Sequence, residues 1–73
     1  MTITTYYVTH RLGRSDADAN ATVHLINDLA INSGECRSWD ATRALLNELV
    51  DADTQERFGI SIEAEQCELE FDD

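Results

Sequence analysis

The chain has 73 residues, with 15 acidic side chains against 5 arginines and no lysine, and a net charge of -10. This length has room for one domain, residues 1–73, and so negative a field repels nucleic-acid phosphates and anionic membranes while it attracts basic surfaces. We therefore expect no direct binding to nucleic acid or membranes. The same composition is typical of proteins adapted to high salt, and this explanation of the charge stays open.

Residues 2–12, TITTYYVTHRL, predict a first strand, because Thr, Tyr, Ile and Val favour a pleated surface. Alternation places Tyr6 and Val8 on one face, with His10 on the same side. Gly13 then predicts a turn.

A helix should follow the turn, with Ser15 as its cap and Asp18 as a weak capping-box partner. The apolar side predicted for this helix consists of Ala19, Val23, Leu25, Ile26, Leu29 and Ala30. The polar side consists of Asn20, His24, Asn27 and Asp28. Ser33 and Gly34 predict its end.

Ser38 is the candidate cap of a second helix. Its apolar residues at helical spacing are Trp39, Ala41, Leu45, Leu46, Leu49 and Val50. We expect Trp39 to anchor the core. The polar run at residues 51–56 should be a connection that leads into the last strand.

The last third of the chain, RFGISIEAEQCELEFDD, alternates with the period of a strand. One apolar set consists of Phe58, Ile60 and Ile62, and a second set in the opposite phase consists of Cys67, Leu69 and Phe71. Both sets share a face only if a bulge or tight turn intervenes near Glu65 and Gln66. The acids that we select as partner-binding residues are Glu63, Glu65, Glu68, Glu70, Asp72 and Asp73.

The order strand, helix, helix, strand predicts an α+β fold with two helices packed on a small antiparallel sheet. The architecture is βααβ, or βααββ if the last strand is split. The first and last strands should be neighbours, because Arg11 and Arg14 could then offset part of the acidic line at the end of the chain.

No catalytic or metal-binding signature occurs in the sequence. His10, His24, Cys36 and Cys67 include the ligand types of zinc but lack a close C-x-x-C or H-x-x-x-H spacing. No candidate nucleophile lies in a glycine-flanked elbow. We expect a protein that is not an enzyme and that has no cofactor or metal, with His24 in solvent and His10 packed against Tyr6 or an acid.

The first residues, MTITTYYVTH, lack the basic start and apolar run of a signal peptide, and no stretch approaches the roughly 18 apolar residues of a membrane span. Cys36 and Cys67 are too few for a disulfide scaffold, although one bridge is allowed if the fold brings them together. We expect a cytoplasmic protein with reduced thiols.

Carboxylates two residues apart on a strand stand roughly 6.6–6.8 Å apart. Successive phosphates of a nucleic-acid strand, with an axial rise of ~3.4 Å per charge, are separated similarly. A basic site built to hold a phosphate backbone could therefore accept Glu68, Glu70 and Asp72. The alternative is a solvated strand face whose charges only prevent aggregation.

In size, acidity, lack of a catalytic signature and compact mixed fold, the whole chain resembles anti-CRISPR proteins, the small inhibitors that phages and other mobile elements make against host defence complexes. Some of these proteins are similar to nucleic acid in charge layout and occupy the DNA or RNA path of their target. The resemblance rests on no motif. It implies a location in the host cytosol and a partner such as a CRISPR effector complex.

Together these observations predict a small acidic protein that binds and inhibits a basic, nucleic-acid-binding partner by steric and electrostatic occlusion. The alternative is a structural or regulatory module that self-associates as a homodimer, with its acidity serving solubility or a saline cytosol.

Overall fold

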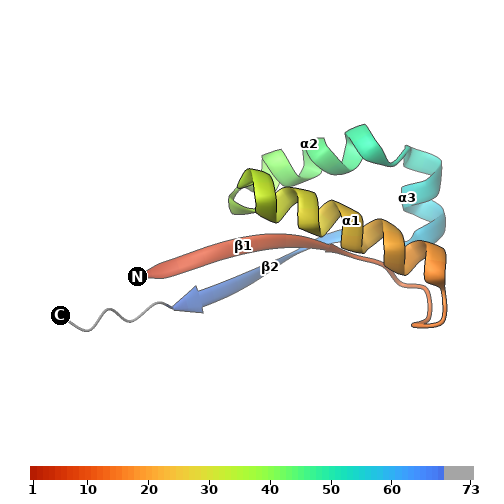
Figure 1. Ribbon diagram of the computed structural model, residues 1–73, viewed down its shortest axis with the longest axis horizontal. Coiled ribbons are helices and arrows are strands. Elements are labelled where there is room, and N and C mark those ends of the chain that lie inside the picture. Colours follow the sequence, from red (N-terminus) through yellow and green to blue (C-terminus); the bar gives the residue numbers. More distant parts are fainter. Residues whose placement is uncertain (69–73) are drawn as a thin grey trace.

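The computed structural model describes residues 1–68. Its elements in chain order are β1 (Thr2–Thr9), α1 (Ala17–Ser33), the 3₁₀ turn η1 (Glu35–Arg37), α2 (Trp39–Leu49), α3 (Ala52–Phe58) and β2 (Ser61–Glu68). The two strands form an antiparallel ribbon, and α1 and α2 lie on one side of it (Figure 1). The predicted α+β class and the pairing of the first and last strands are confirmed.

The pairing of β1 with β2 is continuous, from Thr2 opposite Glu68 to Thr9 opposite Ser61. The strand through Glu68 therefore has neither the bulge nor the split that the sequence allowed. Because residues opposite each other share a face, Val8 and Ile62 point to one side and Cys67 points to the other. The predicted continuation of the strand through Leu69 and Phe71 lies outside the described residues.

The core lies between the helices and the end of the ribbon nearest them. Its buried apolar cluster consists of Val8, Ile26, Leu46 and Val50, and the side chains packed against it are Val23, Leu45, Ile60 and Ile62. The prediction that Trp39 anchors the core is wrong, because its side chain is 47% exposed. The large predicted core residues that are also exposed are Leu25, Leu29 and Leu49. Two strands form a narrow platform, so they cover only the middle of each apolar helix side.

The ends of α1 and α2 follow local signals that the sequence carries. α1 is capped by Asp16 and not by Ser15, since the Asp16 carboxylate accepts the Ala19 N–H at 2.9 Å. α1 ends at Gly34, which has a left-handed φ of 82°. Ser38 caps α2 as predicted, with its hydroxyl accepting the Ala41 N–H at 3.3 Å.

A third helix, α3, replaces the connection predicted at residues 51–56, and Phe58 ends this helix instead of starting the strand. Asp51 caps α3 by accepting the Thr54 N–H at 2.7 Å, and Gly59 ends it with a φ of 65°. A capping acid and a helix-ending glycine at this spacing are a recognisable signal for a short helix. Helix α3 thus connects α2 to β2 and reverses the direction of the chain.

Asn27 joins α1 to the outer edge of β1, although the sequence placed it on the polar side of its helix. Its side-chain oxygen accepts the Val8 N–H at 2.8 Å, and its amide donates to the Val8 carbonyl at 3.1 Å. The Asn27 amide thus makes the two hydrogen bonds to Val8 that a neighbouring strand would make. Val8 is only 1% exposed. It satisfies two backbone groups that would otherwise be desolvated without partners.

Replacing Asn27 with alanine should lower the free energy of unfolding by about 1–3 kcal/mol, because two buried backbone groups of Val8 lose their partner. Thermal unfolding should report this as a fall in Tm of roughly 4–8 °C per kcal/mol. The control is Asn32→Ala, an exposed position on the same helix. Equal losses in the two variants would contradict a bridging role for Asn27.

The cap of α3 should make stability depend on pH. The side-chain hydrogen bond with Thr54, then the backbone hydrogen bond from Thr54 and the charge of Arg57, hold the pKa of Asp51 below its ordinary value of 3.8. Because the pKa of Asp51 is lower in the folded than in the unfolded chain, its carboxylate stabilises the fold at pH values above the unfolded-state pKa. This stabilisation is lost as the pH falls through the folded-state pKa.

We therefore expect Asp51→Asn to melt below the wild type near neutral pH and to approach it below the carboxyl pKa, in thermal scans from about pH 7 to about pH 3. Asp53→Asn is the control, because it removes an equal charge from the first turn of α3 at a residue that does not cap the helix. A gap between Asp51→Asn and wild type that stays constant across this range would refute the assignment.

Candidate functional site

The ribbon projects beyond the helices. In Figure 1 the half of the ribbon nearest the chain ends extends past α1 and α2, and in β2 every residue from Glu63 to Glu68 is exposed. The radius of gyration is 13.5 Å, compared with roughly 11 Å for a compact domain of this length. This part of the sheet is therefore available to a partner from several directions.

The side of the ribbon that faces away from the helices is here named the open ribbon face. It consists of Ile3, Thr5, Tyr7, Glu63, Glu65 and Cys67. The register places Glu63 opposite Tyr7 and Glu65 opposite Thr5. Two carboxylates and a half-buried aromatic ring thus share one surface.

The structure brings together only part of the predicted acidic set. Glu63 and Glu65 lie on the open ribbon face, whereas Glu68 lies on the opposite face because it is an odd number of residues from both. The unbroken register is the physical reason for this division. The other predicted residues, Glu70, Asp72 and Asp73, lie outside the described residues.

The carboxylates of the open ribbon face are not neutralised by the arginines near the start of the chain. Arg11 lies at the opposite end of the ribbon, where its N–H donates to the Phe58 carbonyl at 3.0 Å. From Ser61, which lines the same cleft as Arg11, the strand rises by roughly 7 Å to Glu63 and roughly 13 Å to Glu65. Neither Glu63 nor Glu65 has an ion-pair partner within residues 1–68, so Arg11 and Arg14 make no direct ion pair with these acids.

The histidines have local partners. His24 is 79% exposed and lies 3.1 Å from Asp28, which confirms its expected solvent position. His10 donates a hydrogen bond from Nε2 to the Asn20 side-chain oxygen at 2.7 Å, a partner that the sequence did not predict. Among the described residues, no group of three or more His, Cys, Asp and Glu side chains gathers in a way that could hold a metal ion.

The two cysteines are apart and unpaired. Cys36 is buried in η1, while Cys67 is exposed on β2. The bridge that the sequence left open is not formed. Within residues 1–68, no helix has the length and apolar character needed to cross a bilayer.

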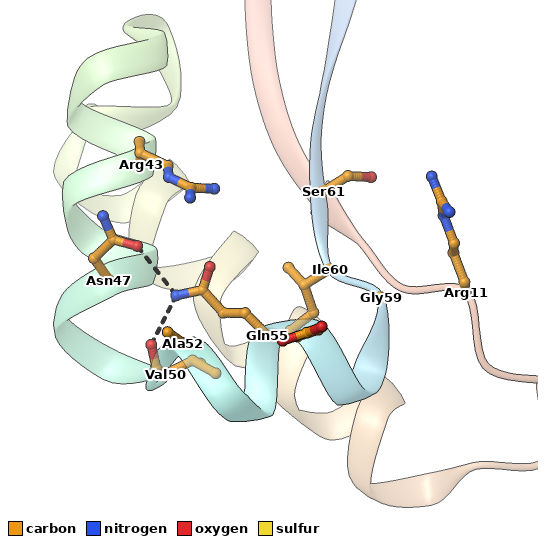
Figure 2. Close-up of a pocket in the computed structure, with 10 residues that line it drawn as sticks. Arg11, Arg43, Asn47, Val50, Ala52, Gln55, Gly59, Ile60 and Ser61 are labelled. Atoms are coloured by element: carbon orange, nitrogen blue, oxygen red, sulfur yellow. Dashed lines mark hydrogen bonds between the residues drawn. The ribbon is translucent and has the colours of Figure 1, made fainter.

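A cleft of about 700 Å³ lies where α2, α3 and the start of β2 meet. No pattern in the sequence indicated it. Figure 2 shows Arg43 pointing from α2 into this space, while Arg11 comes from the segment after β1 beside Gly59. The other residues that line the cleft are Asn47, Val50, Ala52, Gln55, Glu56, Gly59, Ile60 and Ser61. Residues of α3 and its ends form one wall of the cleft, and the sequence pattern predicted a connection at this position.

Most polar groups in the cleft already have structural partners. The Gln55 amide donates to the Asn47 side-chain oxygen at 3.1 Å and to the Val50 carbonyl at 2.8 Å (Figure 2). The Ser61 hydroxyl lies 3.3 Å from the Thr9 hydroxyl. Arg43 has no ion-pair partner within the described chain, but Glu56 lies in the same lining. The cleft therefore contains both arginine and glutamate side chains, and this combination indicates no particular ligand.

Gly59 fixes how closely the two chain segments beside the cleft approach each other. A Cβ atom at this position would lie 2.9 Å from the Arg11 Cβ, and the φ of 65° also disfavours a side chain. Gly34 has a similar φ of 82° but open space around its missing Cβ. Gly34→Ala should therefore cost about 1–2 kcal/mol from backbone strain alone, and Gly59→Ala should cost more in urea unfolding. Equal costs would mean that the Arg11 segment moves aside freely.

Comparison of the chain with protein-family models, with curated proteins and with solved structures gives no match in any of the three.

Proposed function

We propose that this protein is a non-enzymatic binding protein that docks its open ribbon face onto a basic surface of another protein. The observation that carries the proposal is the pair Glu63 and Glu65, which are exposed on the ribbon face turned away from the helices and have no ion-pair partner within the described chain. Exposed carboxylates without a basic neighbour can pair with arginine or lysine side chains that a partner supplies.

The surface combines a charge pattern with an apolar anchor. Glu63 and Glu65 are two residues apart on one strand face, which sets them roughly 6.6–6.8 Å apart. Tyr7 lies opposite Glu63, and an aromatic ring adds contact area at little conformational cost. The overall charge of -10 speeds the encounter with a basic surface, and the aromatic contact slows release.

The partner that fits this chemistry best is a protein whose basic surface normally holds a nucleic-acid backbone. Carboxylates at this spacing can replace phosphates on such a surface, so docking would exclude DNA or RNA by occupation and by charge. The acids Glu70, Asp72 and Asp73 add to the negative charge of the same chain end. A CRISPR effector complex is one partner of this class, and inhibition of it would follow from the occlusion.

The charge-removing variant Glu63→Gln/Glu65→Gln should bind a fluorescent oligoarginine peptide about three- to tenfold more weakly than wild type at low salt, since exposed ion pairs are worth ~0.2–1 kcal/mol each. Asp40→Asn/Glu48→Gln is the matched control, because it changes the net charge equally but on α2. Fluorescence anisotropy measures both. Binding should fade toward about 1 M salt, where the Debye length is roughly 3 Å.

If both double variants bind alike, the net charge alone drives binding and the open ribbon face is not the contact. Occlusion is tested separately with a basic protein that has been captured on the wild-type chain. The binding of this protein to labelled duplex DNA or RNA should fall when the wild-type chain is added. It should fall less when Glu63→Gln/Glu65→Gln is added instead. Simultaneous binding of chain and nucleic acid would remove the occlusion mechanism.

A further inference from the structure

The outer edge of β1 carries a row of backbone groups without partners in the described chain. Along an antiparallel strand, residues alternate between bonding one neighbour and facing away from it. Val8 bonds to Asn27, so its N–H and C=O face away from β2. Thr2, Thr4 and Tyr6 lie at even steps from Val8 and therefore face the same way, and no other backbone or side-chain group within residues 1–68 bonds them.

The two edges of the ribbon differ in charge. β1 has the sequence TITTYYVT, without a charged residue, whereas β2 carries Glu63, Glu65 and Glu68. Charged side chains protect an exposed edge from pairing, because like charges directly opposite each other repel. The β2 edge is therefore protected against a second copy, and the β1 edge is not.

The projecting half of the ribbon has only two strands. A two-stranded ribbon without a covering layer is marginal in water, and three or more strands or a packed helix are normally needed. Beyond the helices, β1 and β2 have only each other (Figure 1). An added strand at the β1 edge would satisfy the outward backbone groups and cover part of the half-buried Ile3.

We propose that a second copy of this chain pairs at this edge, β1 against β1, to form a four-stranded antiparallel sheet with the order β2-β1-β1-β2. A two-fold axis at Thr4 matches the exposed groups: Thr4 faces Thr4, and Thr2 of each copy faces Tyr6 of the other. Asn27 ends the paired edge at Val8. The acidic β2 strands form both outer edges, so the assembly closes as a dimer and does not grow into a fibre.

The dimer uses an edge of the ribbon and leaves the open ribbon face uncovered, so it does not depend on the proposed function. The two-fold axis is perpendicular to the sheet, so the open ribbon faces of both copies lie on the same side of the four-stranded sheet. The two β2 strands then lie about 14 Å apart, three strand spacings of ~4.8 Å. Salt separates the two interactions, because screening favours association of two negative chains and opposes binding to a basic partner.

The test is sedimentation equilibrium of the full chain over a range of concentrations and potassium chloride levels. Wild type should be dimeric at the higher concentrations, and more so as salt is raised. Thr4→Pro should be monomeric, since it removes an outward N–H without removing a bond between β1 and β2. Ala64→Pro is the matched control, because Ala64 lies opposite Tyr6 and its N–H faces the other edge; it should remain dimeric. A monomeric wild type at every condition, or equal dimerisation of both proline variants, overturns the proposal.

A cross-linking variant keeps the test decisive if a proline unfolds the ribbon. The two Thr4 residues would form a hydrogen-bonded pair with Cα atoms about 5.5 Å apart, which is within the range of a disulfide. With Cys36 and Cys67 replaced by serine, Thr4→Cys should oxidise to a covalent dimer, while Ala64→Cys in the same background should not. Equal yields of covalent dimer from the two edges contradict pairing at β1. Oligoarginine binding by monomeric Thr4→Pro shows whether the proposed function survives independently.

Discussion

The unbroken register between β1 and β2 is the constraint on which the rest of the structure depends. Because side chains alternate strictly along a paired strand, the register directs Val8 and Ile62 into the core and sends Glu63 and Glu65 to the opposite surface. A shift of one residue would exchange these two sets. The same alternation determines which backbone groups face the outer edges, so core, charged surface and free edge all follow from one pairing.

The core that maintains this register is small, and polar contacts at its boundary complete it. The central cluster consists of four buried apolar side chains, which come from β1, α1, α2 and the residue that ends α2. Thr42 is fully buried and donates its hydroxyl to the Glu35 carbonyl at 2.9 Å, while Asn27 holds the edge of β1. For so short a chain, where the margin of stability is narrow, such hydrogen bonds are a large part of what specifies the arrangement of the helices on the ribbon.

The arginines, unlike the acids, are absent from the two strands. The ribbon contains acids and no arginine, whereas Arg11 and Arg43 line the cleft at the end where the helices meet the ribbon. Within residues 1–68, the ribbon acids Glu63, Glu65 and Glu68 therefore have no ion-pair partner. The uncharged β1 edge beside them suits contact with an identical chain.

The sequence by itself determined the class of fold, the pairing of the terminal strands, the position of α2 and the end of α1, because strand alternation, Ser38 and Gly34 are local signals with local consequences. It also determined that acids would dominate the last strand. Only the tertiary structure decided which helical side chains are buried, since Trp39 and Leu49 are apolar yet no second layer covers them. It alone turned Asn27 toward the backbone of Val8 and assigned Glu65 and Glu68 to opposite faces. Periodicity describes one element at a time, whereas burial, capping across elements and the sharing of a face depend on which elements meet and in what register.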